Sequence, residues 1–202
     1  MRDGTGRLVV AITGASGAIY GVRLLQRAAE AYDLVHVVLT EHACQVLATE
    51  LGIVVDPAAP TSEALLGQPC AHIKFLSRHD FFTPPASGSY RHDGMVIVPC
   101  SMGVAGRIAH GISDDLVTRG ADVCLKERRR LVLVVRETPW SLVHLRNLTA
   151  LAEAGATILP ASPSFYNQPA SIEDVVDTVV ARVLQHLGVD QRVVPQWAYT
   201  EE

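Results

Sequence analysis

The first residues that could do chemistry form a glycine-rich turn after an apolar run. Residues 8–12 are all apolar, and Gly14, Ser16 and Gly17 follow at once. A buried strand that ends in such a turn and leads into a helix offers free N–H groups and the positive end of a helix dipole to an anion. The turn therefore predicts a phosphate site, to which Ser16 adds a hydroxyl. A plain strand-to-helix turn, in which Ser16 only caps the helix, is the alternative.

The spacing of the glycines in this turn excludes two common nucleotide-binding motifs. Gly14, Gly17 and Gly21 do not match the G-x-G-x-x-G dinucleotide fingerprint, and no acidic residue closes the next apolar run, which is followed by Thr40. No Gly-Lys-Ser/Thr follows, as a P-loop requires. The pattern favours a mononucleotide or another phosphate and makes a nicotinamide dehydrogenase unlikely.

Apolar runs alternate with helical patterns along the chain. We expect strands at 8–12, 35–39, 95–98, 131–135 and 156–159, and helices at about 17–30, 41–50, 104–110, 114–127, 141–154 and 171–187. Residues 53–55 and 73–76 could be short strands around a helix at 62–66, and 81–93 is expected to be loop. The alternation predicts an α/β fold, a doubly wound parallel sheet with helices on both faces. We expect one domain over 1–202, with a C-terminal tail from about residue 188.

Ligands bind at the carboxyl ends of the strands in such a sheet. The segments that follow the expected strands are Gly14–Gly17, Thr40, Ser101–Gly103, Arg136–Glu137 and Phe165–Tyr166. They offer hydroxyls, glycines, an arginine, a carboxylate and a phenol. This set suits a phosphorylated aromatic ligand better than a metal or a nucleic acid.

Composition narrows the class of protein further. The formal net charge of −4 gives no bulk attraction to nucleic acid, and no apolar run reaches the ~18 residues of a membrane span. The N-terminus lacks a signal-peptide core. Four widely spaced cysteines predict reduced side chains in a cytoplasmic protein rather than disulfides or a metal site. A hydrophobic fraction of 49% predicts subunit interfaces, hence a homo-oligomer.

Several longer motifs resemble one known family. They are Gly14–Gly21, Pro99–Gly103, Gly111–Leu116, Arg119–Val123, Leu125–Arg129, Arg136–Pro139 and Phe165–Tyr166. From about residue 7 to 197 the chain resembles the UbiX family of flavin prenyltransferases. The resemblance implies a Rossmann-like or flavodoxin-like fold, a homododecamer, and transfer of a dimethylallyl group to N5 and C6 of reduced FMN. The prenylated FMN would serve UbiD-type decarboxylases.

The resemblance also implies roles for individual residues. The FMN-binding residues would be Gly14, Ala15, Ser16, Thr40, Ser101, Met102, Gly103, Val104 and Arg136. Those that bind dimethylallyl monophosphate would be Ser87, Gly88, Ser89, Arg119, Lys126, Tyr166 and Arg182. Arg119 and Lys126 could come from a neighbouring subunit. Ser16, Glu50, Glu137 and Trp197 would be catalytic, with Glu137 the first choice of proton carrier and Trp197 shielding the prenyl group.

These assignments have simpler alternatives. Glu50 could be an ordinary surface residue near a helix end, Glu137 could be structural, and Tyr166 could belong to the core. Trp197 could pack in an interface, and Asp114 and Asp115 could simply start a helix. The run 126–130 could be a solvated helix end, which we expect for 128–130 but less for Lys126.

Two other functions remain open. One is an FMN-binding accessory subunit of an aromatic acid decarboxylase. The other is a flavin-dependent cysteine decarboxylase, although that class is expected to carry Pro-x-Met-Asn where this chain has Arg136–Pro139. We further expect turnover without a metal and a preference for a monophosphate donor, because Arg119, Lys126, Arg136 and Arg182 can balance a phosphate dianion.

Overall fold

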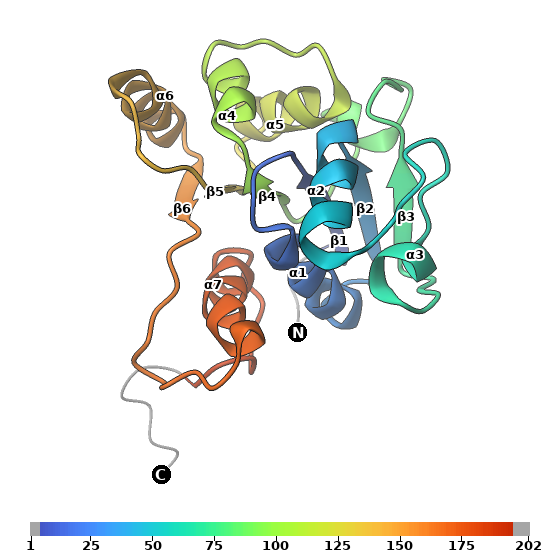
Figure 1. Ribbon diagram of the computed structural model, residues 1–202. Helices are drawn as coiled ribbons and strands as arrows, with labels where there is room; N and C mark the ends of the chain where they lie inside the picture. Colours follow the sequence, from blue (N-terminus) through green and yellow to red (C-terminus); the bar gives the residue numbers. More distant parts are fainter. Residues whose placement is uncertain (1–4, 196–202) are drawn as a thin grey trace.

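The strands form one parallel sheet. The structure is a computed structural model that describes residues 5–195, and Figure 1 shows its elements. The strands are β1 (Arg7–Ile12), β2 (Leu34–Leu39), β3 (Ile73–Leu76), β4 (Met95–Cys100), β5 (Leu131–Val135) and β6 (Thr157–Pro160). They pair in the order β3-β2-β1-β4-β5-β6, and every pairing is parallel. The predicted parallel sheet is confirmed.

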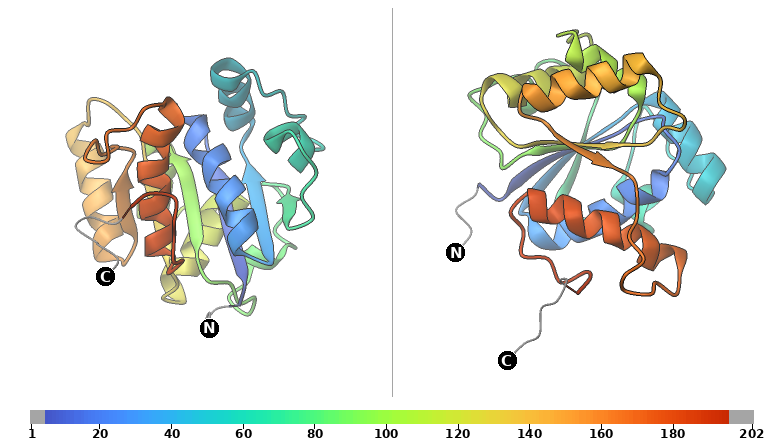
Figure 2. Two further views of the ribbon diagram at one scale, coloured as in Figure 1. Left: turned by 90° about the horizontal axis from the view of Figure 1, so that it is seen from below. Right: turned by 90° about the vertical axis from the view of Figure 1, so that its left-hand side faces the viewer.

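Helices cover both faces of this sheet. They are α1 (Ala18–Ala31), α2 (Glu41–Leu51), α3 (Ser62–Leu66), α4 (Met102–Ala109), α5 (Leu116–Lys126), α6 (Leu142–Glu153) and α7 (Ile172–His186). Helices α1 and α7 pack together on one face, whereas α4, α5 and α6 lie on the other (Figure 2). The doubly wound architecture is therefore confirmed, and its strand order is that of the Rossmann fold.

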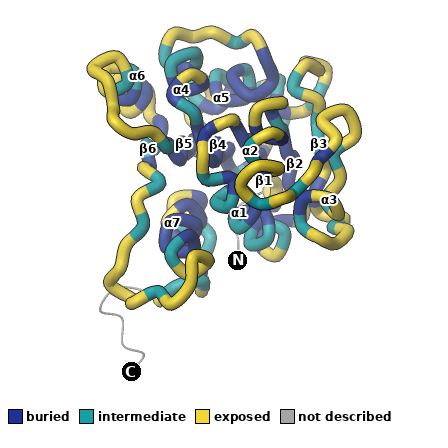
Figure 3. The backbone as a smooth tube through the Cα atoms, viewed as in Figure 1, coloured by how far each residue is buried: buried dark blue, intermediate teal, exposed yellow. Residues whose placement is uncertain are grey.

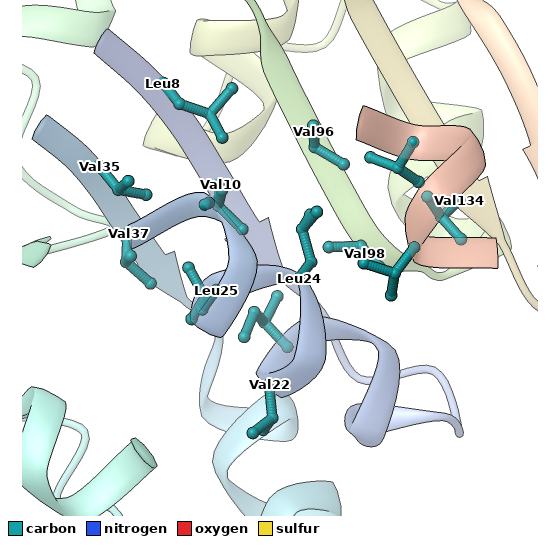
Figure 4. Close-up of a cluster of buried hydrophobic side chains, with 14 of the residues drawn as sticks. Leu8, Val10, Val22, Leu24, Leu25, Val35, Val37, Val96, Val98 and Val134 are labelled. Carbon is teal, nitrogen blue, oxygen red and sulfur yellow. The ribbon is translucent and has the colours of Figure 1, made fainter. Parts of the chain in front are cut away.

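Alternate strand residues point to opposite faces, which builds an apolar core on each side. Leu8, Val10 and Val35 pack under α1 and α7 (Figure 4), whereas Val9 and Ile97 pack under α4, α5 and α6. All five side chains are at most 1% exposed. Each fully buried aliphatic side chain contributes about 2 kcal/mol. The buried strands in Figure 3 are thus a firm support for the turns at their ends.

Of the two segments that could be short strands, one is a strand and the other is not. Residues 53–55 are loop, because the Ile53 N–H bonds back to the Leu47 carbonyl and Val54 is 79% exposed. Ile73–Leu76 does form a strand, paired with β2 at the sheet edge. The expected loop at 81–93 contains one turn of 3-10 helix, η1 (Pro84–Ala86).

One side of α6 is apolar and exposed. Leu142, Val143 and Leu145 are 61%, 62% and 45% exposed. Part of the high hydrophobic content of the sequence therefore lies on this exposed side of α6. Within residues 5–195, no helix combines the length and apolar character needed to cross a bilayer.

Candidate active site

The ends of β1 and β4 adjoin at the point where the strand order reverses. Thr13 ties their turns together: its hydroxyl donates to the Pro99 carbonyl (2.7 Å) and accepts the Ser101 N–H (2.9 Å). The Thr13 side chain is 1% exposed, so this link is shielded from water. Sequence reasoning missed Thr13. A polar residue directly after a buried strand was the available signal.

Glu50 occupies the helix N-terminus that was expected to be open. Its carboxylate accepts the N–H groups of Gly17 and Ala18, each at 2.9 Å. Gly17 is the N-cap of α1 at φ 98°, a conformation that favours glycine. The expectation that these two N–H groups are free for a phosphate is therefore wrong, because a carboxylate of the protein already fills the position.

The same contacts settle two of the simpler alternatives. Burial alone would raise the pKa of Glu50, but hydrogen bonds from the Ser16 side chain and from the Ala18 and Gly17 N–H groups, with the charge of Arg136, hold that pKa below its ordinary value. Glu50 is thus tied into the turn and is not an isolated surface residue. Ser16 does not cap α1, because the cap is Gly17 and has no side-chain hydrogen bond.

Two further helix N-termini border a cavity of about 410 Å³ beside the turn. Thr40 caps α2 by accepting the Ala43 N–H, and Ser101 caps α4 by accepting the Val104 N–H. The cavity is lined by Thr13, Gly14, Thr40, His42, Arg78, Ser101, Gly103, Val104 and Arg107. Gly14 and Thr40 are predicted cofactor residues. Of the four further ones at Ser101 to Val104, all except Met102 line this cavity. Helix N-termini and two arginines suit an anionic group such as a phosphate.

Two arginines of this cavity were not predicted. Arg78 and Arg107 both reach the carboxylate of Asp115, at 3.4 Å and 3.2 Å, and Arg107 also pairs with Asp114 at 2.6 Å. Arg78 lies just after β3. The rule that ligands bind at the carboxyl ends of strands would have pointed to it, but residues 73–76 were only a possible strand in the sequence. Arg107 lies within α4 and had no comparable signal.

Asp115 starts α5, as one alternative suggested. It forms a capping box with Thr118 and is 1% exposed. Burial would raise its pKa, but the hydrogen bonds from Thr118 and the charge of Arg107 hold the pKa below its ordinary value. Its carboxylate is therefore occupied by the helix cap and two arginines.

Besides Thr40, three predicted cofactor residues, all apolar, have buried side chains. Ala15, Met102 and Val104 are 8%, 6% and 5% exposed, and Met102 and Val104 belong to the core under α4. Any contact they make with a ligand at this edge would come mainly from their backbone. Gly103 is exposed between them.

Arg136 brings a third strand end to the turn. Its Nε donates to the Ser16 carbonyl at 3.3 Å, and its N–H bonds to the Cys100 carbonyl. Glu137 follows Arg136 and is exposed, and its carboxylate accepts the neighbouring Thr138 N–H at 3.0 Å. Ser16, Glu50 and Arg136, predicted from three separate segments, thus meet at one place.

The predicted donor-binding residues 87–89 lie elsewhere, beside the end of α5. Arg119 Nε donates to the Ala86 carbonyl at 3.1 Å and also pairs with Asp122 at 2.8 Å. Lys126 pairs with Glu127 at 2.5 Å. Both predicted phosphate ligands therefore have partners within the chain, which a bound phosphate would share or displace.

Lys126 lies toward the opposite edge of the sheet from the turn at Ser16. The α5 N-terminus touches the carboxyl edge, where the Leu116 N–H bonds to the Arg78 carbonyl, and its C-terminus leads back to the start of β5. At 1.5 Å per residue, α5 separates Lys126 from that edge by about 16 Å. One chain therefore does not bring Lys126 to the turn at Ser16.

Tyr166 and Arg182 share a cavity of about 590 Å³ between β6 and α7. Tyr166 is 76% exposed, so the alternative that it belongs to the core is wrong. Arg182 is exposed and donates to Gln185 at 2.6 Å. Trp197 lies outside the described residues.

Cysteine and metal chemistry are not evident in the described part of the chain. Cys44, Cys70, Cys100 and Cys124 are free, and three of them are buried. Burial raises the pKa of Cys100 and of Cys124 to about 12, so neither is a ready nucleophile. Among residues 5–195, no three His, Cys, Asp or Glu side chains cluster as a metal site.

A Rossmann-type sheet whose switch point holds a cavity lined by helix N-termini and arginines is typical of nucleotide-binding proteins. The chain matches the Flavoprotein family model over residues 2–184. It is 45% identical over 199 residues to the flavin prenyltransferase UbiX of Pseudomonas aeruginosa, covering 96% of this chain and 95% of that one.

Solved structures agree with this match. A UbiX crystallised with FMN and dimethylallyl pyrophosphate superposes with a TM-score of 0.83 at 40% identity, covering 96% of this chain and 98% of that one. A dodecameric FMN-dependent UbiX-like decarboxylase from Escherichia coli gives 0.84 at 37%, covering 96% and 100%. The chain belongs to the UbiX family of flavin prenyltransferases, within the wider flavoprotein family.

Proposed function

We propose that this protein is a flavin prenyltransferase, which transfers a dimethylallyl group from dimethylallyl monophosphate to N5 and C6 of reduced FMN. The observation that carries the proposal is the meeting of Ser16, Glu50 and Arg136 beside a cavity whose arginines and helix N-termini suit an anion. Near full-length identity to flavin prenyltransferases supports the same reaction.

The residues present fit FMN. The N-termini of α2 and α4 and the arginines Arg78 and Arg107 could hold its phosphate, while Gly14 to Ser16 and Gly103 offer backbone toward the rest of the molecule. When bound, reduced FMN supplies the nucleophilic N5 and C6 positions.

The chain's own residues would assist the departure of phosphate and the transfer of a proton. Cationic side chains stabilise charge on the leaving phosphate, and we assign this to Arg119, Lys126, Arg136 and Arg182, with Tyr166 and the hydroxyls of Ser87 and Ser89. Glu137, exposed next to Arg136, is our choice to accept the proton released on ring closure. For Trp197, which lies outside the described residues, we propose the role of shielding the prenyl group.

The assembly and its setting belong to the proposal. We propose a homododecamer, because Lys126 and Ser16 lie toward opposite sheet edges in one chain and a UbiX-like relative is dodecameric. The exposed apolar side of α6 supports subunit contacts. The free cysteines suit the cytoplasm, and the product would pass to a UbiD-type decarboxylase.

The test is to incubate the protein anaerobically with reduced FMN and dimethylallyl monophosphate, then to weigh the extracted flavin. We expect noncovalently bound FMN whose mass increases by one dimethylallyl group, less the proton lost. Recovery of FMN with unchanged mass would instead support the accessory-subunit function. The Arg136–Pro139 segment and the family match weigh against a cysteine decarboxylase.

A further inference from the structure

The loop at residues 86–90 is held from outside by arginines. Its own hydrogen bonds are few. The Tyr90 N–H bonds to the Ser87 carbonyl, the Ser89 N–H bonds to the Ser87 hydroxyl at 3.3 Å, and the two serine hydroxyls bond to each other at 2.8 Å. Arg119 and Arg129 hold its backbone from outside, because both donate to backbone carbonyls of the loop. The position of Ser87 and Ser89 therefore depends on side chains from the α5 region.

Arg129 makes the central contact. Its guanidinium donates to the Tyr90 carbonyl at 2.6 Å and to the Gly88 carbonyl through a second nitrogen. The two acceptors lie on either side of Ser89, so one planar group fixes both ends of that short segment. We expected a solvated helix end at 128–130. That expectation is wrong for Arg129, which is partly buried against the loop.

The backbone around Arg129 is itself fixed. Arg128 turns the chain at φ 56°, the Arg129 N–H returns to the Cys124 carbonyl at 2.8 Å, and the Arg130 carbonyl accepts the Met95 N–H at 2.9 Å. The guanidinium therefore extends from a support tied to both α5 and β4. Arg129 can therefore hold the Gly88 and Tyr90 carbonyls in fixed positions relative to α5 and β4.

The loop packs directly against a predicted phosphate ligand. A β-carbon at Gly88 would lie 2.3 Å from Oε1 of Glu127 and 2.9 Å from Nζ of Lys126. Only glycine fits at this distance unless those side chains shift. Any movement of Gly88 would thus change the spacing between the serine hydroxyls and the Lys126 ammonium.

We propose that Arg129 is a positioning residue that holds Ser87–Ser89 at a set distance from Lys126, and so sets the affinity for the donor phosphate. The proposal rests on the proposed function. Arg129 acts through the loop carbonyls and does not itself contact the donor. Its removal should weaken donor binding and leave FMN binding unchanged, because Arg78 and Arg107 lie toward the other sheet edge.

Tyr90 supplies a second, independent anchor. Its hydroxyl bonds to Nε2 of His36 at 3.0 Å, and Arg7 lies over its ring at 5.4 Å from the centroid. His36 belongs to β2, so this contact joins the loop to the sheet rather than to α5. Tyr90→Phe removes the hydroxyl alone and gives a smaller perturbation of the same loop.

The experiment compares Arg129→Gln, Arg129→Lys and Tyr90→Phe with the wild type, using Arg128→Gln as the matched control because Arg128 is adjacent and exposed. Hydrogen exchange of the 86–90 peptide is measured without ligands, and KM for dimethylallyl monophosphate, kcat and FMN affinity are measured separately. For Arg129→Gln we expect faster exchange and a KM raised about tenfold, with kcat changed by less than about threefold.

The variants should differ in the size of their effect on donor KM and loop exchange. Arg129→Lys should recover part of the loss, because an ammonium keeps the charge but not the two-pronged geometry. Tyr90→Phe should raise KM for the donor less than Arg129→Gln does. If Arg129→Gln does not fold, the test uses Tyr90→Phe and Arg129→Lys instead. Unchanged exchange and KM in these variants, or a fall in kcat at unchanged KM, would overturn the role of Arg129. Absence of prenylated flavin from the wild type would instead overturn the proposed function, since loop exchange is measured without the reaction.

Discussion

The two regions that the reaction would use are built in different ways. At the carboxyl edge, Arg136 directly follows β5 and Ser16 lies in the short turn after β1, so the sheet itself sets their places. At the end of α5, Ser87 and Ser89 lie on a loop whose backbone is held by Arg119 and Arg129. The first region is positioned by the core and the second by a few polar contacts, so changes should affect them differently.

The largest effect is expected at the carboxyl edge, for Glu137→Gln. The change keeps the volume and removes the charge, so FMN should still bind while product formation falls by roughly 10²-fold or more, the usual scale for an acid–base group. The measurement is the rate of prenylated FMN formation, with Glu153→Gln on the exposed end of α6 as control. Turnover at the wild-type rate would remove Glu137 from the mechanism.

A second change tests how firmly the carboxyl edge is supported. Asp115→Ala leaves Arg78 and Arg107 without their buried partner and removes the α5 cap. We expect the free energy of unfolding to fall by about 3 kcal/mol in denaturant titrations. Asp114→Ala, at an exposed neighbouring position, is the control and should cost well under 1 kcal/mol. Equal losses would show that the buried ion cluster is not the support.

The same carboxylate gives a pH dependence with a definite sign. The pKa of Asp115 is lower in the folded protein than in the unfolded chain, so its contribution to stability is fully present above the unfolded value of about 3.9 and is lost as pH falls through the folded value. The stability difference between wild type and Asp115→Asn should therefore be constant from pH 8 to 5 and shrink below about pH 4. A difference that already shrinks between pH 7 and 5 would contradict the low pKa.

Glu50 should show a smaller effect. Glu50→Gln retains an oxygen for the Gly17 and Ala18 N–H groups but loses the charge, so we expect a roughly tenfold fall in product formation. Because the pKa of Glu50 is also lowered, the activity ratio of wild type to variant should not change between pH 5 and 8. A ratio that approaches one toward pH 5 would show that Glu50 titrates in that range.

The smallest effect is expected from metal removal. Treatment with EDTA should leave the rate unchanged, because guanidinium and ammonium groups can balance a phosphate dianion. The monophosphate donor should be preferred, although a related UbiX was crystallised with the pyrophosphate. Loss of activity with EDTA that magnesium restores, or a clear preference for the diphosphate, would show that the cations have been misassigned.

The two regions also differ in how far the sequence predicts them. Apolar runs such as 131–135 predicted the strands and a parallel sheet, because parallel strands buried on both faces need continuous apolar sequence. The strand-end rule then placed Ser16, Thr40 and Arg136 at one edge. Spacing alone could not show that Glu50, on another helix, would fill the N-terminus of α1.

The loop at 86–90 was less predictable. Its anchor is a side chain of Arg129 bound to backbone carbonyls, and backbone carbonyls carry no residue-type signal. The run of five charged residues at 126–130, at the end of α5, is also what a solvated helix end would show. The family resemblance pointed to Ser87–Ser89 and Lys126 but not to what holds them together.

The central claim is that one active site combines the carboxyl edge of one subunit with the α5 end of another. It can be tested by co-expressing Glu137→Gln with Lys126→Ala, each inactive alone, and measuring prenylated FMN formed by the mixed assembly. Random mixing should restore about a quarter of the wild-type sites. A site is intact only where the Lys126→Ala chain supplies Glu137 and the Glu137→Gln chain supplies Lys126, which is one of the four possible pairings. A mixed assembly as inactive as either variant alone would contradict the claim, because it would mean that both groups act within the same chain.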